Sequence, residues 1–108
     1  MTTLQRSRAK MKHRVIDTAM LEGVSEIFKI LGDPTRMHIL AVLARKNVCV
    51  IELADEVGVT QSAISHQLRM LKTMRLVASK RMGKRIIYSL ADKHVETLLK
   101  TAIRHFAE

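Results

Sequence analysis

Apolar residues recur at helical spacing in the first half of the chain. Positions 20, 24, 27, 28 and 31 are apolar, and this spacing predicts a helix that ends at Gly32. Asp33-Pro34 is a helix start signal, with an acidic N-cap and proline at the first helical position. We expect the helix that follows to reach about Arg45, with three residues pointing inward: Ile39, Leu40 and Leu43.

Residues 50–73 have the layout of a helix-turn-helix. A short helix is expected over about 49–57, Gly58 permits the turn, and Thr60 is a suitable N-cap for a second helix to about Met74. The apolar residues of this second helix recur at i, i+4 and i+7 and point to the core: Ile64, Leu68 and Leu71. Its polar residues point outward: Gln61, Ser62, Ser65, His66 and Arg69.

After the helix-turn-helix the period of the pattern changes. The segments Leu76–Arg81 and Lys84–Leu90 are short and rich in β-branched residues, and Met82-Gly83 joins them, which predicts a β-hairpin. A last helix begins near Asp92 and carries a continuous apolar stripe: Val95, Leu98, Leu99, Ala102, Ile103 and Phe106. The predicted fold is mainly α with a small β-hairpin wing, a winged helix-turn-helix.

Charge is distributed unevenly along the chain. Nineteen lysines and arginines against ten acids give a formal net charge of +9. Residues 1–16 hold five bases and no acid, and residues 57–91 hold seven bases and no acid. A polyanion is the natural partner of such a chain, and nucleic acid is the leading candidate. A membrane surface is disfavoured, because the bases are spread over a helix and a hairpin rather than along one helix.

Length and cysteine content limit the class of protein. A chain of 108 residues forms one domain with a small core, and a small core favours dimerisation. We expect a basic arm over 1–16 and the winged domain over 17–108. The single cysteine, Cys49, excludes an intrachain disulfide framework and suits a reducing cytoplasm. Residues 1–16 do not resemble a signal peptide and no apolar run approaches a membrane span, so we expect a cytoplasmic protein outside the membrane.

Double-stranded DNA is the expected partner. Many small helical domains share the apolar spacing of a helix-turn-helix, but the acid-free basic surface and the following hairpin favour DNA binding. Residues at the start and outer face of the second helix are placed to contact base edges and phosphates in a major groove: Gln61, Ser62, Ser65, His66 and Arg69. The hairpin bases would then contact the flanking backbone or minor groove: Lys80, Arg81, Lys84 and Arg85. His66 has no second metal-ligand type at helical spacing, which favours a DNA contact or a plain surface residue.

Four residues of the last helix are suitable ligands for a divalent metal: Asp92, His94, His105 and Glu108. His94 and His105 lie on nearly the same helix face but about 16 Å apart along the axis. One helix cannot close a site whose ligand atoms lie about 2 Å from the metal, whereas two antiparallel copies can. The spacing therefore predicts a homodimer with two equivalent intersubunit sites, with the apolar stripe at the interface. For any one of the four residues, an ordinary place on an amphipathic surface is the simpler interpretation.

The ligand types indicate which metal such a site would hold. Two imidazoles and two carboxylates suit tetrahedral Zn(II), with Co(II) a good substitute. Ni(II) would need extra ligands, which His13 or the α-amine of the arm could supply. If Asp92 is the N-cap of the helix, its backbone is not yet helical and its side chain can converge with that of His94. Glu108 is the last residue, so its α-carboxylate competes with its side chain as the ligand.

With these elements placed, the chain resembles the ArsR/SmtB family of winged-helix metal-sensing repressors from about Leu21 to the end. Three stretches carry the resemblance: FKILGDPTRMHIL (28–40), ELADEVGVTQSAISHQLRML (52–71) and GKRIIYSLADKHV (83–95). The resemblance implies a homodimer that represses a metal-efflux or sequestration operon and leaves its operator when metal binds. It also implies a metal site on paired C-terminal helices, which Asp92, His94, His105 and Glu108 match residue by residue.

The same family implies a second kind of metal site, built on thiolates. In the run Val48-Cys49-Val50-Ile51-Glu52, Cys49 is kept, Ile51 stands where a second cysteine can occur, and Glu52 stands where an acid can occur. The arm has no cysteine, so only His13, or less plausibly Asp17, could complete the site. A small buried Cys49 is the simpler interpretation, and loss of the second thiol disfavours sulfur-preferring metals.

The expected mechanism is a coupling between the two sites. Metal would hold the paired helices in one orientation and thereby set the separation of the two DNA-reading helices, so that operator DNA and metal weaken each other's binding. In the family, the second ring nitrogen of the histidine matching His105 passes the signal on. The alternatives are a regulator responsive to Ni(II), Co(II) or a non-metal signal, a non-specific nucleoid or RNA-binding protein, and a small metalloenzyme. An enzyme is disfavoured because four protein ligands leave no open position.

Overall fold

The computed structural model describes residues 16–108, so that the predicted basic arm lies outside the described residues except for Ile16. Within the described residues, 16–30 and 31–108 belong to two separate units, which are described one at a time. In the first unit, helix α2 (Thr18–Leu31) starts after Asp17, whose Oδ1 accepts a hydrogen bond from the Met20 N–H at 2.8 Å. This helix confirms the one predicted to end at Gly32.

The second unit begins with three helices that follow the predicted boundaries closely. Helix α3 (Pro34–Arg45) has Asp33 as its N-cap, and Oδ2 of this residue accepts from the Arg36 N–H at 3.0 Å. Helices α4 (Val50–Val57) and α5 (Gln61–Thr73) form the helix-turn-helix. The predicted bounds of all three helices are therefore correct to within a residue or two.

A two-stranded antiparallel sheet follows, made of β1 (Val77–Met82) and β2 (Arg85–Leu90). The predicted turn at Met82-Gly83 is wrong by one residue, because Met82 still pairs with Arg85 and the turn is Gly83-Lys84. Gly83 takes a φ of 65°, so the glycine occupies the first turn position, where a side chain would be strained. The strands pair with Val77 opposite Leu90, and helix α6 (Lys93–Ala107) follows directly.

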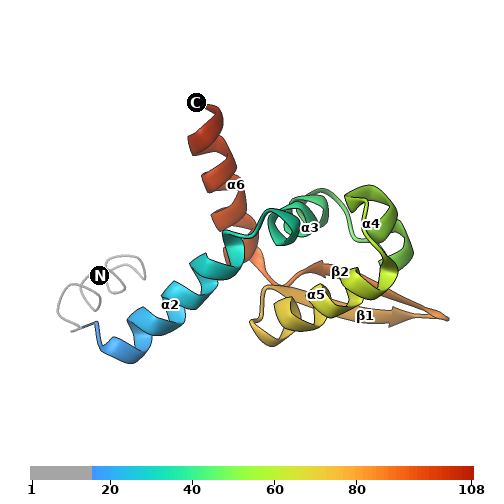
Figure 1. Cartoon of the computed structure of the whole chain (residues 1–108), viewed down its shortest axis with the longest axis horizontal. Coiled ribbons are helices and arrows are strands. Elements are labelled where there is room, and N and C mark those ends of the chain that lie inside the picture. Colours follow the sequence, from blue (N-terminus) through green and yellow to red (C-terminus); the bar gives the residue numbers. More distant parts are fainter. Residues whose placement is uncertain (1–15) are drawn as a thin grey trace, which may run out of the picture. The chain divides into compact units, whose positions relative to one another are not determined.

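The core of the second unit lies where these helices meet the hairpin. Helices α3, α4 and α6 contact β2, and α5 contacts β1 (Figure 1). The most deeply buried side chains come from every one of these helices and from the segment between α3 and α4: Ile39, Leu40, Val42, Val48, Leu53, Ile64, Leu68, Leu71 and Leu99. All three inward residues predicted for α5, and Ile39 and Leu40 of α3, are in this set, and Leu43, the third predicted for α3, is also buried at 4% exposed. The mainly helical winged fold predicted from the periodicity is confirmed.

One connection was not predicted. Val48, in the segment between α3 and α4, forms an isolated antiparallel bridge with Tyr88 of β2. The Tyr88 N–H donates to the Val48 carbonyl at 2.8 Å, and the Val48 N–H donates back at 3.2 Å. This bridge fixes the start of the helix-turn-helix to the hairpin, and a single residue gives no periodic signal by which it could have been found.

Candidate nucleic-acid interface and metal-ligand residues

The turn between α4 and α5 is built as the sequence indicated. Gly58 has a φ of 82°, and its N–H and that of Val59 both donate to the Ala54 carbonyl, at 2.9 and 3.2 Å. A left-handed backbone costs a residue with a side chain about 1 kcal/mol or more, which explains the glycine. Thr60 then caps α5, since its Oγ1 accepts from the Ala63 N–H at 3.0 Å. The predicted turn and cap are both confirmed.

Helix α5 separates an apolar face from a polar one. Four of the five predicted DNA-contacting residues of this helix are exposed, namely Gln61, Ser62, His66 and Arg69. Ser65 is half-buried, so that it reaches the surface less than the predicted outward position implies. The exposed side of the helix therefore presents an amide, hydroxyls, an imidazole and a guanidinium, all able to hydrogen-bond to base edges or phosphates.

Two side-chain contacts hold α5 in place, and neither was predicted. The Arg36 Nε–H of α3 donates to Gln67 Oε1 at 2.9 Å. At the other end of the helix, Lys72 Nζ donates to Ser79 Oγ of β1 at 2.7 Å. These contacts join α5 to its neighbours on both sides, so the helix would meet a duplex as part of a rigid frame that includes the hairpin. Such pairs depend on packing that sequence periodicity does not report.

The hairpin is the most basic part of the described chain. Its predicted DNA-contacting residues are all exposed: Lys80, Arg81, Lys84 and Arg85. None of the seven bases between residues 57 and 91 forms an ion pair with an acid in residues 16–108. Their charge is therefore directed to solvent or to a partner. Phosphates are suitable counter-charges, since neutralising them releases condensed cations from the duplex.

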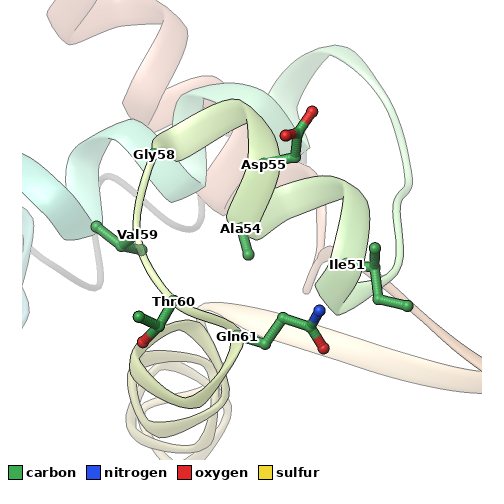
Figure 2. Close-up of a pocket in the computed structure, with 7 residues that line it drawn as sticks. All are labelled: Ile51, Ala54, Asp55, Gly58, Val59, Thr60 and Gln61. Carbon is green, nitrogen blue, oxygen red and sulfur yellow. The ribbon is translucent and has the colours of Figure 1, made fainter.

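A depression of about 540 Å³ lies at the start of α5. It is lined by residues of α4 and of the turn: Ile51, Ala54, Asp55, Gly58, Val59, Thr60 and Gln61. Figure 2 shows the Gln61 amide extending along this depression toward Ile51, whereas the Asp55 carboxylate lies on the far side of α4. The N-terminal end of α5 is therefore open to a partner.

Cys49 and Glu52, two members of the predicted second metal site, do contact each other. The buried Cys49 thiol donates to Glu52 Oε1 at 3.1 Å. This hydrogen bond is the main cause that lowers the pKa of Glu52, with a smaller contribution from the charge of Arg85. His13, the third predicted member, lies outside the described residues. Within residues 16–108 the pair is a thiol–carboxylate hydrogen bond that satisfies both groups.

The predicted C-terminal ligands lie at the two ends of α6. Asp92 is the N-cap, as predicted, and its Oδ1 accepts from the Val95 N–H at 3.0 Å. The same oxygen lies 3.6 Å from His94 Nδ1, so these two side chains converge; they are 52% and 97% exposed. His105 and Glu108 are exposed at the other end of the helix. No group of three metal-ligating residues gathers within residues 16–108, so each end of α6 presents two donors.

These donor pairs fit a metal site that is completed by another helix. Asp92 Oδ2 is left available, because capping uses Oδ1. Neither His105 nor Glu108 is paired with a base or an acid among the described residues. Imidazole and carboxylate donors of this kind suit Zn(II) or Co(II).

Other ion pairs stabilise the frame around these residues. Glu56 of α4 pairs with Arg45 and with Lys46, whose Nζ lies 3.0 Å from Oε2; the hydrogen bonds from Lys46 and then Arg45 lower the pKa of this carboxyl group. On α6, the hydrogen bond from Lys100 lowers the pKa of Glu96, and Lys93 also approaches it. Both carboxylates are therefore charged at neutral pH; Glu56 joins α4 to the end of α3, whereas the ion pairs of Glu96 lie within α6.

The helix-turn-helix, the capped second helix and the basic hairpin define a winged helix-turn-helix DNA-binding protein. Residues 33–79 match the bacterial regulatory protein family arsR. The chain is 38% identical over 99 residues to a transcriptional repressor SmtB homolog of Synechocystis sp., covering 92% of this chain and 75% of the relative. The chain belongs to the ArsR/SmtB family, and it is a DNA-binding transcriptional repressor and not an enzyme.

Two further comparisons agree with this assignment. The chain is 36% identical over 86 residues to the cadmium resistance transcriptional regulatory protein CadC homolog of Staphylococcus aureus, covering 79% of this chain and 71% of the relative. A homodimeric winged helix-turn-helix domain of Mycobacterium bovis, a possible ArsR-family regulator, has a similar structure. Its TM-score is 0.81 at 28% identity, and the match covers 89% of each chain.

Among the helices of residues 16–108, none has the length and apolar character needed to cross a bilayer.

Proposed function

We propose that this protein is a homodimeric repressor that releases operator DNA when it binds Zn(II) or Co(II), and so controls genes of metal homeostasis. The observation that carries the proposal is the division of the four candidate ligands between the ends of α6. Asp92 and His94 converge at one end, and His105 and Glu108 are exposed at the other. One relative is named for cadmium resistance, which supports a response to metal. One similar structure is homodimeric, which supports the dimer.

The exposed apolar end of α6 supports the dimer. Val95 and Leu99, at its start, are buried in the core, but Ile103 is 50% exposed and Phe106 is 93% exposed. An exposed phenylalanine beside an exposed isoleucine is costly in water, and pairing with a second copy would remove both from solvent. Two antiparallel α6 helices would place the His94 end of one beside the His105 end of the other.

The link from ligands to DNA would run through the start of α6. When bound, the metal would supply a cross-link between the two α6 helices. One residue, Ala91, separates Asp92 from the end of β2, and the Ala91 N–H donates to the Leu76 carbonyl at 3.1 Å. A movement of Asp92 would therefore also move the base of the hairpin, which lies next to the end of α5. Because β2 also carries Arg85, the same movement would change how the basic hairpin meets the duplex.

Metal-dependent DNA release tests this proposal. The full chain would first be used to select duplexes from a random pool, and binding to a fluorescent copy of the selected duplex would be followed by anisotropy. Adding Zn(II) or Co(II) should weaken binding, and a chelator should restore it. His105→Ala should bind the same duplex but respond little to Zn(II). Metal-independent binding by the parent chain, or unchanged release by His105→Ala, would contradict the proposed role. A response to Ni(II) alone would favour the alternative metal.

A further inference from the structure

Ile51 is an apolar residue that the core does not use. It lies in the first turn of α4 and is 63% exposed, although its neighbours Leu53 and Ala54 are buried. A single exposed isoleucine is common on protein surfaces. This one is unusual in its position, because it lies beside the start of the helix that is placed to contact DNA bases.

Two surface depressions meet at Ile51. The first contains Thr60 and Gln61 at the start of α5, and Figure 2 shows the Gln61 amide directed toward Ile51 across it. The second, of about 250 Å³, is lined by Ile51 together with Lys84 and Arg85 of the hairpin. Ile51 therefore lies between the N-terminal end of α5 and the basic turn of the hairpin, the two places where a duplex is expected.

Two acids, Glu52 and Asp55, lie near Ile51 in the sequence. The Glu52 carboxylate accepts the hydrogen bond from the Cys49 thiol, and the positive charge of Arg85 acts on it as well. The Asp55 side chain lies on the side of α4 away from Gln61 (Figure 2). An apolar spot flanked by lysine and arginine complements a DNA groove, in which phosphates border the base edges.

We propose that Ile51 contacts the C5-methyl group of a thymine in the operator, next to the base that Gln61 contacts. Thymine is the only base with an apolar group in the major groove, and aliphatic side chains contact it there. Ile51 would be a specificity-determining residue for DNA that lies outside α5. The inference rests on the proposed entry of α5 into a major groove, and it adds a base preference that α5 alone does not supply.

Replacing thymine by deoxyuridine tests this contact, because uracil lacks only the methyl group. Each thymine of the selected duplex would be replaced in turn, symmetrically in both half-sites, and the affinity of the full chain would be measured. At one position the parent chain should bind about fourfold more weakly per half-site, the factor expected for one buried methyl group. Ile51→Ala should bind the thymine duplex more weakly by a similar factor and should not distinguish thymine from uracil at that position.

Ile86→Ala is the matched control, because Ile86 is the other exposed isoleucine of the second depression and does not line the first. This variant should keep the thymine preference of the parent chain. Unfolding temperature and sedimentation should be unchanged in Ile51→Ala. If no thymine responds, if Ile51→Ala still prefers thymine, or if Ile51→Ala loses self-association, the inference is overturned while DNA binding stands. If the parent chain selects no duplex at all, the proposed function fails as well.

Discussion

Asp92 caps a helix and is also a proposed metal ligand, and two substitutions can separate the cap from the proposed role. Its carboxylate caps α6 through a 3.0 Å hydrogen bond from the Val95 N–H, and it is a proposed metal ligand. Asn is as good an N-cap as Asp, whereas Ala cannot cap. We expect Asp92→Asn to fold almost as stably as the parent chain but to lose its response to Zn(II). Asp92→Ala should lose both folding stability and the response to Zn(II).

The size of the stability effect follows from the cap. Loss of an N-cap side chain lowers the free energy of unfolding by about 1 kcal/mol. Because the Asp92 side chain is 52% exposed, we expect Asp92→Ala to lose about this amount and not more. For a domain of this size, 1 kcal/mol lowers the unfolding temperature by about 4–6 °C. Asp92→Asn keeps the hydrogen bond and loses only the interaction of a charge with the helix dipole, about 0.3–1 kcal/mol.

Thermal unfolding with and without Zn(II) measures both effects at one protein concentration. A ligand at 100 times its Kd stabilises the folded state by about 2.7 kcal/mol, so Zn(II) should raise the unfolding temperature of the parent chain clearly. Thr60→Ala is the matched control, because it removes the cap of α5 and no proposed ligand. This variant should lose about as much stability as Asp92→Ala, and Zn(II) should still raise its unfolding temperature. If Asp92→Asn gains as much from Zn(II) as the parent chain, the carboxylate is not a ligand.

Three further outcomes follow from the described contacts. Replacing both Lys84 and Arg85 with Ala should reduce the slope of log K against log salt for duplex binding by about 1.8 for each half-site, or about 3.6 for a dimer, since each phosphate contact contributes about 0.9; an unchanged slope would place the hairpin away from the phosphates. Leu68→Ala leaves a cavity at a fully buried position and should cost about 2–5 kcal/mol in urea unfolding, whereas a cost below 1 kcal/mol would contradict the packing. The pKa of Glu56 is lowered in the folded state by Lys46 and Arg45, so its pairing stabilises the fold above the ordinary pKa of a glutamate. That contribution is lost as pH falls through the lowered value, and Glu56→Gln should therefore be less stable than the parent chain at pH 7, with the difference in stability shrinking as the pH falls below the ordinary pKa of a glutamate.

Local patterns in the sequence determined most of the secondary structure. Asp33, Thr60 and Asp92 are each followed by a helix, and each caps it through a backbone N–H three residues later. These signals are local because a cap and its helix lie within one turn of each other. The hairpin turn was predicted one residue too early in the sequence, because the residue pattern could not show whether Gly83 is the first or the second residue of the turn.

The arrangement of the DNA-contacting surface was only partly determined by the sequence. The polar face of α5 and the basic hairpin are visible in the residue order, and both are exposed as expected. The contacts that fix them join residues far apart in the chain, such as Arg36 with Gln67 and Val48 with Tyr88. The position of Ile51 beside Gln61 likewise depends on the packing of α4 against α5.

The proposed metal ligands show most clearly what the sequence determined and what the structure added. The sequence alone determined the ligand types and their eleven-residue offset, because helical rise converts that offset into a length greater than one metal site. The sequence left the convergence of Asp92 and His94 conditional on Asp92 being the N-cap, and the structure decided it, because Asp92 caps α6 and its Oδ1 lies 3.6 Å from His94 Nδ1. The reason is that a cap residue has extended rather than helical backbone, and its side-chain direction is set by the hydrogen bond to Val95.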